Sequence, residues 1–426
     1  MSKILHAYVD GKLAGSFAES RGQITFEYAL GATQPISLSM PISSSRHKNK
    51  AASAWLWGLL PDNQEALRSM AVEAGTSATS VFGLLQHHGR DVAGAIQLLP
   101  PGEVPSDARK KSVTTVQERL SDTELEQLLR ETTDRYSGKP VTTFVTDAFK
   151  FSVAGAQPKI ALTADENEDF LPPSKEFPTT HIIKPNDPQS SSYIKEMDIL
   201  EVMCLAAARR VGLDAANAYL WYAPSGTMSA VVTERYDRAI NEDGTIDRLH
   251  QEDFCQAMSV LPEKKYQHQH GGPGLNAISK FLESTLPAVD APRVILDLFR
   301  AAVFNVGIVG TDAHAKNYSL MIEGSTVSLA PLYDTISAAS HVQIYDKVFF
   351  PMKINDSYNM MSITPDGLVK AGTKMGIPEQ QAHDSVYSIL CKLPGAIEDV
   401  AAEMGEVDLG QSVLDGLAQF SPVRYI

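Results

Sequence analysis

The sequence predicts an α+β fold, because strand-type patterns dominate one stretch of the chain and helix-type patterns dominate the next. Three units follow one another: an N-terminal α+β unit at 1–105, a strand-rich lobe at 145–240 and a mostly helical lobe at 241–426. The 426 residues suit two or three domains of about 150 residues each. A strand-rich lobe followed by a helical lobe leaves a cleft between them, and ligands commonly bind in such clefts.

Short strands and helices are expected in the N-terminal unit. Alternating hydrophobic residues predict strands at 5–11, 12–15 and 24–28. From Ala51 the hydrophobic spacing becomes helical, and further helices are expected around Ala66 and Val81. The stretch 98–105, rich in Pro and Gly, ends the unit, because both residue types interrupt helices and strands.

One helix precedes the strand-rich lobe and another interrupts it. Ser121 and Glu124 form a capping-box pattern, which predicts a helix that runs at least to Arg130. A second helix is expected at about 194–210, followed by Gly212 as a natural terminator. Strands are expected at 151–153, 159–162, 181–184, 218–222 and 229–233.

The helical lobe contains a long buried helix. Pro292 suits its first position, and hydrophobic residues from Val294 to Val306 recur at spacings of three and four. The helix is expected to stop near Gly307 and Gly310. The chain beyond Gln251 is therefore predicted to be mostly helical.

Composition excludes several classes of protein. Lys and Arg number 37 and Asp and Glu 51, so the net charge is −14 and binding of nucleic acid over the whole surface is not expected. Local basic patches or a basic partner protein remain compatible with this charge. Cys204, Cys255 and Cys391 are too few for a disulfide framework or zinc site, and are expected to be buried, reduced thiols of a cytoplasmic protein. No secretory signal or membrane span is expected, since suitable hydrophobic runs are absent.

The segment after the long helix carries the strongest chemical signal. Asp312 and Asn317 are five positions apart, the spacing of the kinase catalytic loop, and His314 and Lys316 lie between them. In that loop the Asp accepts the proton of the substrate hydroxyl and the Asn binds magnesium, which prefers oxygen ligands. Phosphoryl transfer needs such positioning and charge stabilisation more than covalent help from the protein.

Three further residues occur in the order found in kinases. Asp334, after a short turn and strand, stands where a kinase has its metal-binding Asp, although Tyr333-Asp334-Thr335 replaces the usual Asp-Phe-Gly. Lys184 ends a hydrophobic strand, and Glu201 lies on the following helix, as in the ion pair that orients nucleotide phosphates. Each signal has a structural alternative: Lys184 could extend from a strand end to water, and Glu201 could be a surface residue. Their combined order favours a kinase.

The phosphate-binding loop has no standard motif. A Walker-type P-loop is absent from the sequence, and the best candidate is 152–159, whose small residues let backbone amides approach phosphate beside Lys159. The Gly-rich stretch 271–274 follows His268 and His270 and is interpreted as a loop between helices. Neither a serine-hydrolase elbow nor a zinc-protease motif occurs.

Several segments together resemble one family. They include Ala-Gly-Ala-Gln at 154–157 and Asp-x-His-x-Lys-Asn at 312–317, with further matches at 8–15, 36–41, 59–63, 89–94, 181–184, 234–238, 251–254, 271–274 and 333–334. Through these segments the chain resembles the HipA family of bacterial serine/threonine-protein kinase toxins. The resemblance implies a bilobal fold like that of atypical protein kinases or lipid kinases, with the N-terminal unit added to it.

The resemblance also implies residue roles, with ATP and Mg²⁺ as cofactors. Asp312 would be the catalytic base, Asn317 and Asp334 the magnesium ligands, and Glu201 the structural partner of Lys184. The remaining residues expected to bind ATP are Ala154, Gly155, Ala156, Gln157, Pro158, Lys159, Lys184, Glu234, Arg235, Tyr236, His314, Lys316 and Tyr333. Pro158 departs from the polar residue usual in the loop and is expected to stiffen it.

Regulation and partners are implied in the same way. Ser152 matches the autophosphorylated serine of the family, and its phosphate would expel the loop from the ATP site. The expected partner is a HipB-like, dimeric helix-turn-helix antitoxin, which would supply most contacts to operator DNA. The known substrate of the family is glutamyl-tRNA synthetase.

Two alternatives stay open. A kinase acting on a lipid or metabolite would use the same loop, because any alcohol can accept the phosphoryl group. A non-catalytic pseudokinase scaffold in a repressor complex would not need Asp312 and Asn317, so their presence argues against it.

Overall fold

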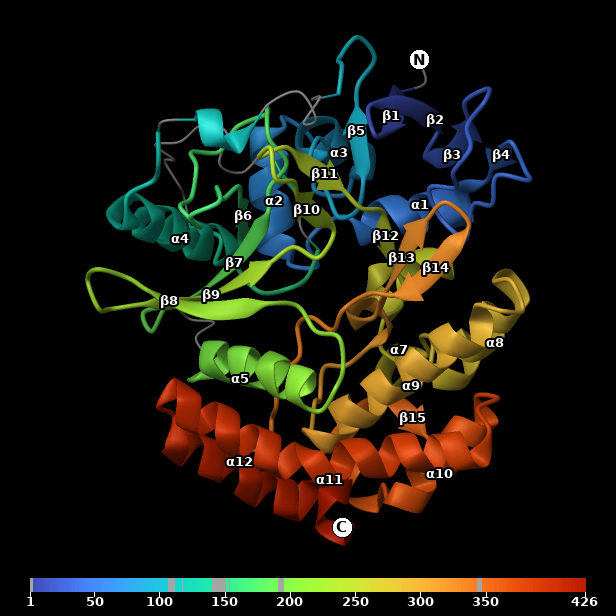
Figure 1. Cartoon of the computed structure of the whole chain (residues 1–426). Helices are drawn as coiled ribbons and strands as arrows, with labels where there is room; N and C mark the ends of the chain where they lie inside the picture. The colour runs from blue at the N-terminus through green and yellow to red at the C-terminus, as the bar shows by residue number, and fades with distance from the viewer. Residues whose placement is uncertain are drawn as a thin grey trace.

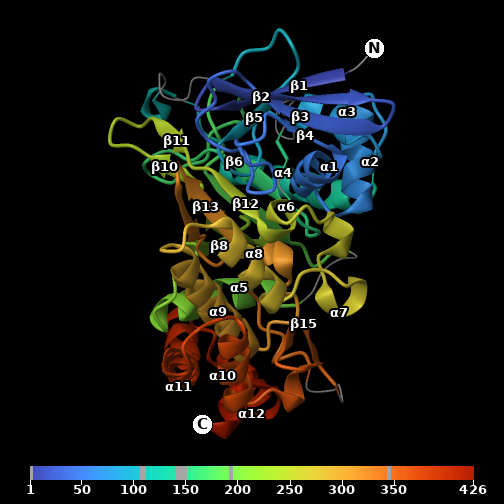
Figure 2. The same ribbon diagram turned by 90° about the vertical axis from the view of Figure 1, so that its right-hand side faces the viewer.

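The computed structural model describes residues 3–105, 112–116, 118–139, 151–152, 154–190, 195–342 and 347–426. The predictions made for 145–150, Val153 and Ile194 lie outside these residues. The N-terminal unit lies at one end of the molecule, beside the strand-rich lobe, and the helical lobe forms the other end (Figures 1 and 2).

The N-terminal unit is a five-stranded antiparallel sheet covered by helices. The strand order is β4-β3-β2-β1-β5, and α1 packs on β3. Phe17 and Phe26 from the sheet meet Trp55 of α1 in the core, where the rings of Phe17 and Trp55 stack with centroids 5.6 Å apart. The elements are β1 (Lys3–Val9), β2 (Lys12–Ser20), β3 (Gln23–Tyr28), β4 (Arg46–His47), α1 (Asn49–Gly58), α2 (Gln64–Glu73), α3 (Val81–His88) and β5 (Ile96–Leu99).

The strand-rich lobe has a four-stranded antiparallel sheet in the order β6-β7-β9-β8. The helix predicted from the capping box is α4 (Asp122–Tyr136), and Ser121 and Glu124 cap it reciprocally. The strand predicted at 151–153 is wrong for the described residues Phe151 and Ser152, which form a bend and coil. The strands are β6 (Ile160–Leu162), β7 (His181–Asn186), β8 (Ala218–Tyr222) and β9 (Ser229–Glu234), followed by the hairpin β10 (Arg238–Ile240) and β11 (Ile246–Arg248).

Helix α5 (Met197–Arg210) joins the two lobes. It begins three residues after the predicted start at 194 and packs against β7, β8 and β9 on one side and against α11 on the other (Figure 1). Its buried residues Leu200, Met203 and Leu205 belong to the core of the helical lobe. The helix therefore fixes the sheet of one lobe to the core of the other.

The helical lobe contains the predicted long helix, α9 (Ala291–Gly307), with Pro292 in its first turn. It also contains a sheet ordered β12-β13-β14 and a hairpin of β15 and β16. Strand β14 is the short strand expected before Asp334, whereas the sequence interpretation missed β12, β13, β15 and β16. The elements are β12 (Gln251–Asp253), α6 (Phe254–Ala257), α7 (Gln267–His270), α8 (Leu275–Thr285), β13 (Ser319–Glu323), β14 (Thr326–Leu329), β15 (Phe349–Ile354), β16 (Ser357–Asn359), α10 (Pro365–Lys374), α11 (Glu379–Met404) and α12 (Val407–Phe420).

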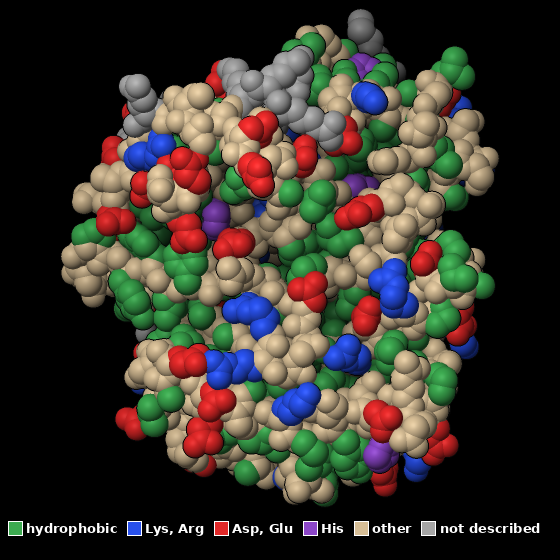
Figure 3. All heavy atoms as spheres, in the orientation of Figure 1, with side chains coloured by type: hydrophobic (Ala, Val, Ile, Leu, Met, Phe, Trp, Pro, Cys, Tyr) green, Lys and Arg blue, Asp and Glu red, His purple; other side chains and the backbone are tan. Residues whose placement is uncertain are grey.

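The surface mixes charges of both signs. On the face shown in Figure 3, Lys and Arg side chains gather around the middle and lower part among acidic neighbours. Arg210 is paired with Asp399 and Glu403, so its charge is compensated. Of the cysteines, Cys204 and Cys255 are buried as expected, whereas Cys391 is exposed, which corrects that prediction. Among the described residues, we find no helix with the length and hydrophobicity needed to span a membrane.

Candidate active site

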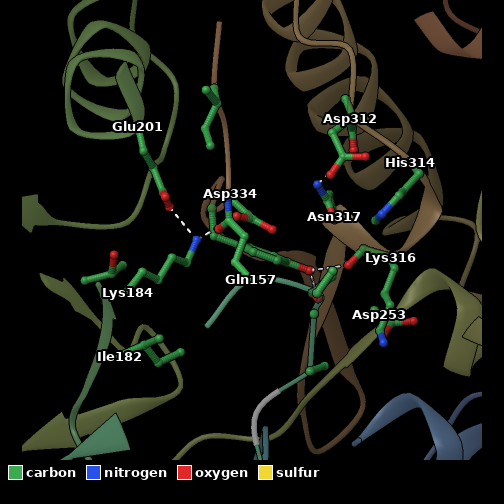
Figure 4. Close-up of a pocket in the computed structure, with 18 of the residues that line it drawn as sticks. Gln157, Ile182, Lys184, Glu201, Asp253, Asp312, His314, Lys316, Asn317 and Asp334 are labelled. Carbon is green, nitrogen blue, oxygen red and sulfur yellow. Dashed lines mark hydrogen bonds and ion pairs between the residues drawn. The ribbon is translucent and has the colours of Figure 1, made fainter. Parts of the chain in front are cut away.

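A cavity of about 560 Å³ lies where the N-terminal unit and the two lobes meet. In Figure 4, Lys184 and Glu201 reach toward it from one side, Asp312, His314 and Asn317 from the other, and Asp334 lies between them. Nearly all of the predicted site residues line it: Ala154, Gly155, Ala156, Gln157, Lys159, Lys184, Glu201, Glu234, Arg235, Tyr236, Asp312, His314, Lys316, Asn317, Tyr333 and Asp334. Ser152 and Pro158 do not.

Lys184 bridges two carboxylates. Its Nζ atom lies 2.7 Å from Oε1 of Glu201 and 2.6 Å from Oδ1 of Asp334. Burial would lower the pKa of Lys184, but Asp334 and Glu201 raise it, so the ammonium form persists. Burial would raise the pKa of Asp334, but Lys184 and Lys159 hold it well below its usual range. Glu201 is only 2% exposed, and burial raises its pKa. Glu201 is therefore a buried partner of Lys184, and the surface alternative is wrong.

The backbone at Asp334 is held in an unusual conformation. Asp334 has φ of +52°, in the left-handed region that residues other than Gly seldom adopt. The preceding Tyr333 is fixed by two hydrogen bonds, since its hydroxyl lies 2.7 Å from Oγ of Ser319 and donates to the Lys316 carbonyl at 2.8 Å. Such strain persists where the surroundings fix it, and here it directs the Asp334 side chain toward Lys184.

The loop after α9 wraps around the backbone of Asp312. The amides of the Asn317 side chain and of the His314 backbone donate to the Asp312 carbonyl at 3.0 and 2.8 Å. The Asp312 carboxylate, in turn, accepts a hydrogen bond from the hydroxyl of Tyr266. Burial raises the pKa of Asp312, and the bond from Tyr266 opposes this rise. The loop thus presents a carboxylate whose basicity is higher than usual.

Asn317 and Asp334 have the chemistry that a magnesium ion requires. The Asn317 amide nitrogen is used by Asp312, which leaves its oxygen available to a cation, and Asp334 is held as a carboxylate. Among the described residues, no group of three or more His, Cys, Asp or Glu side chains could hold a metal alone. Magnesium commonly takes one or two protein ligands and completes its shell with phosphate and water. The two residues fit this pattern.

The loop 154–159 is tied to itself and to the N-terminal unit. Lys159 Nζ donates to the Ala154 carbonyl at 2.9 Å, and burial with repulsion from Lys184 lowers the pKa of Lys159 to about 8. Gly155 has φ of +114°, which favours Gly. The Asp62 amide donates to the Gly155 carbonyl at 3.0 Å. Pro158 lines a smaller cavity and not the main one.

Ser152 lies outside the cavity. Its side chain is buried against the N-terminal unit, where Oγ donates to the Leu59 carbonyl at 2.7 Å and the backbone amide donates to the Asp91 carbonyl at 3.0 Å. The predicted modification site is therefore not accessible in this conformation of the chain.

The connection between the lobes carries three predicted site residues, Glu234, Arg235 and Tyr236, whose side chains make different contacts. The Tyr236 ring lies 5.6 Å from the Tyr333 ring, and the Glu234 side chain accepts a bond from Asn217 at 2.7 Å. The Arg235 side chain instead makes two bonds to Asp237, at 2.9 and 2.8 Å. The Arg235 guanidinium thus bonds within the protein interior, although the residue also lines the cavity.

A buried cluster of charges, here called the interface cluster, continues from Arg235. It comprises Asp91, Arg235, Asp237, Arg238 and Arg248. Asp91 comes from the N-terminal unit, and Arg238 and Arg248 contact its Oδ1 at 3.0 and 3.2 Å. Burial would raise the pKa of Asp91, but Arg238, Arg248 and Arg235 hold it well below its usual range. The cluster fastens the N-terminal unit beside the cavity.

The cavity residues that were missed as site residues in the sequence include Asp62, Asp253, Lys265 and Tyr266. Asp62 lies in the matching segment 59–63, to which no role was given, and Lys265 and Tyr266 precede the Gly-rich stretch 271–274. His314 stays neutral, because burial and the nearby Lys265 lower its pKa to about 3. Its buried Nδ1 has no hydrogen-bond partner among the described residues, as expected of a group that a ligand would satisfy.

Two families match the chain. The family described as HipA N-terminal domain matches residues 5–99, and the family described as HipA-like C-terminal domain matches residues 151–397. The Sinorhizobium fredii protein Y4mE, whose name proposes a kinase, is 32% identical over 388 residues, which cover 88% of this chain and 86% of that protein. The Serine/threonine-protein kinase toxin HipA of Shewanella oneidensis is 26% identical over 387 residues, covering 88% and 82%.

Solved structures include a similar fold. A chain in the complex titled Shewanella oneidensis MR-1 Toxin Antitoxin System HipA, HipB and its operator DNA has a TM-score of 0.77 and 23% identity, covering 98% of this chain and 97% of that chain. This likeness confirms the predicted α+β, bilobal fold with an added N-terminal unit.

Proposed function

This chain belongs to the HipA family, and from that membership and the geometry of its cavity we propose that it is an ATP- and Mg²⁺-dependent serine/threonine-protein kinase that acts as the toxin of a toxin–antitoxin system. One observation carries the proposal. Lys184, held by Glu201, contacts Asp334 on one side of a cavity whose other side presents Asp312 and Asn317. These are the charges that phosphoryl transfer requires, in positions suited to it.

Each side chain has one proposed task. Asp312 accepts the proton of the acceptor hydroxyl, for which its raised pKa suits it. Lys184 and the loop 154–159 hold the nucleotide phosphates, and Asn317 and Asp334 would hold Mg²⁺, which would neutralise phosphate charge. His314, Lys316 and Tyr333 complete the nucleotide site, while Glu234 and Tyr236 flank adenine.

We also propose self-inactivation through Ser152. Its buried Oγ donates a hydrogen bond to the Leu59 carbonyl, so an attached phosphate would break this bond. The phosphate would also place roughly two negative charges in a buried position. The loop that follows would have to leave its place beside Pro61 and Asp62. Modification therefore requires an exposed form of the loop and would stabilise it.

The proposed partners follow from the relatives. The name of the Shewanella complex, which includes HipA, HipB and operator DNA, supports a HipB-like antitoxin and operator DNA as partners. We propose that this antitoxin is a dimeric helix-turn-helix protein, that operator DNA binds mainly through it, and that the complex is an autorepressor. The net charge of −14 agrees with a partner that provides the basic surface. We propose a cytoplasmic protein with domains at 1–105, 145–240 and 241–426, and glutamyl-tRNA synthetase as a candidate substrate.

Mass spectrometry of the full chain tests the proposal. The protein is first treated with phosphatase, then incubated with Mg²⁺ and ATP beside Asp312→Ala. One added phosphate on Ser152, absent in the variant, is expected. Nucleotide binding without any protein labelling would favour a metabolite or lipid kinase, and toxicity unchanged by Asp312→Ala would favour a scaffold.

A further inference from the structure

Asp62 enters the cavity from the N-terminal unit and bridges two lysines of the helical lobe. Its Oδ1 lies 2.6 Å from Nζ of Lys316, and its Oδ2 lies 2.6 Å from Nζ of Lys265. The three side chains are between 4% and 13% exposed. Burial would raise the pKa of Asp62, but Lys316 and Lys265 lower it to about 2, so the bridge is ionic at neutral pH.

The two lysines lie next to the proposed reacting groups. Lys316 precedes Asn317, the proposed magnesium ligand, and Lys265 precedes Tyr266, whose hydroxyl contacts the Asp312 carboxylate. All of these residues line the same cavity. The pair of ammonium groups therefore lies beside the proposed magnesium ligand Asn317 and the proposed base Asp312.

Charge and hydrogen-bond donors indicate what the pair can bind. The two ammonium groups share a single carboxylate at hydrogen-bonding distance, that of Asp62, and Asp253 and Asp312 add attraction to Lys316 and Lys265. Each ammonium group has three donors, so both can still donate to an anion. Lysine ammonium groups are common ligands of phosphate. The proposed reaction brings a phosphoryl group with negative oxygens to this region, beyond those phosphates that Lys184 would hold.

We propose that Lys265 and Lys316 bind the terminal phosphoryl group of the nucleotide, and that Asp62 is the internal counter-ion from which this group takes them. The inference rests on the proposed kinase function and adds a subsite to it. Because the Asp62 amide also donates to the Gly155 carbonyl at 3.0 Å, the same segment that holds the phosphate loop supplies the counter-ion. The N-terminal unit would then be part of the catalytic site.

Calorimetric titration of the full chain with Mg²⁺ and either ADP or a β,γ-imido analogue of ATP tests the subsite. Only the analogue carries the third phosphate. Lys265→Met is expected to weaken binding of the analogue roughly tenfold or more, the effect of losing a hydrogen bond to a charged group, and to leave ADP binding within about twofold. Lys264→Met, which removes an exposed lysine one position earlier, is the matched control and should change neither.

Asp62→Asn keeps the backbone bond to Gly155 and removes the competing charge. It is expected to strengthen binding of the analogue relative to ADP. The subsite would be overturned if Lys265→Met or Asp62→Asn weakened binding of ADP and of the analogue equally. It would also be overturned if neither variant changed the ratio of the two dissociation constants. If the unmodified protein binds neither ADP nor the analogue, the proposed kinase function is overturned instead. Thermal melting of each variant identifies a folding defect.

Discussion

The ammonium group of Lys184 lies 2.7 Å from the carboxylate of Glu201, although one residue belongs to β7 and the other to α5. Since α5 packs its hydrophobic side into the core of the helical lobe, this pair connects the sheet to that core. Asp334, from the far lobe, contacts the same ammonium group at 2.6 Å. The position of the lobes and the charge state of the site are thus linked through one lysine.

Removing Lys184 should harm the protein more than neutralising Glu201. Lys184→Met leaves the buried Glu201 without its partner and Asp334 with Lys159 as its remaining cation, so we expect a loss of about 3–5 kcal/mol in the free energy of unfolding together with loss of nucleotide binding. Glu201→Gln keeps the pair with Asp334 and should cost less. Urea unfolding and calorimetry measure both effects. Lys195→Met, at a side chain that is 75% exposed, should have little effect, and equal effects of all three variants would contradict the assignment.

The sequence was sufficient to predict the Lys184–Glu201 pair. Local periodicity predicts the strand that carries Lys184 and the following helix that carries Glu201, and this order matches the ion pair of kinases. The same reasoning missed Asp62, whose partners Lys265 and Lys316 are 203 and 254 positions away. No local pattern encodes such a distance. The same limit applies to the side chain of Arg235, because the interface cluster that holds it includes Asp91 from another unit.

Local pattern was misleading at Phe151 and Ser152 for a related reason. Alternating residues there predicted a strand, but the Ser152 backbone and side chain bond to Asp91 and Leu59 of the N-terminal unit instead of a sheet. Tertiary hydrogen bonds thus outweighed β propensity. The long helix α9 was predicted well, since its buried face repeats over four turns and depends on no distant partner.

Tyr266→Phe should shift the acidic side of the pH–rate profile of phosphorylation to higher pH. The hydroxyl of Tyr266 stabilises the Asp312 carboxylate, so its loss raises the pKa of Asp312 further above the ordinary Asp value. The base must be deprotonated, and the rate should therefore fall at a higher pH in the variant than in the unmodified protein. A phosphorylation assay across pH 4–8 measures this. Tyr358→Phe is the control, and superimposable profiles for Tyr266→Phe would exclude the coupling.

Gly155→Ala should disturb the phosphate loop. At φ of +114° any side chain is strained, and an added Cβ would lie 2.3 Å from Nζ of Lys159. The strain costs on the order of 1–3 kcal/mol, so we expect KM for ATP to rise about tenfold with little change in the melting temperature. Gly226→Ala, in a hairpin at φ of +66° with open space around its Cβ, is the matched control. An unchanged KM would show that the loop tolerates other conformations.

Asp237→Asn should loosen the N-terminal unit. Asp237 accepts two bonds from Arg235 and one from the Gly94 amide at 2.6 Å, and all are buried. Neutralising it leaves guanidinium charges under-compensated, so we expect the free energy of unfolding to fall by about 3 kcal/mol in urea titration. Asp356→Asn breaks an exposed pair with Lys374 and should cost less than about 1 kcal/mol. Equal losses would contradict a special role for the interface cluster.

Glu252→Gln should change how stability depends on pH. Glu252 is fully buried between the helical lobe and the N-terminal unit, where its Oε1 accepts a bond from the Leu38 amide at 2.7 Å. Its Oε2 has no hydrogen-bond partner among the described residues. Burial raises the pKa of Glu252 to about 8, so the folded protein keeps a proton that the unfolded chain releases above the ordinary Glu value.

The sign of the effect follows from this difference. Between about pH 4.5 and pH 8 the folded state binds more protons at Glu252, so its contribution to stability is full below the unfolded pKa and falls as pH rises toward the folded pKa. Glu252→Gln lacks this loss, and the variant should gain stability relative to the unmodified protein, on the order of a few kcal/mol, over the same range. Urea unfolding at pH 5 and pH 8 measures the difference. For the exposed Glu27→Gln, the free energy of unfolding should depend on pH as it does in the unmodified protein. If Glu252→Gln also showed the same dependence on pH as the unmodified protein, Glu252 would be ionised in the folded protein.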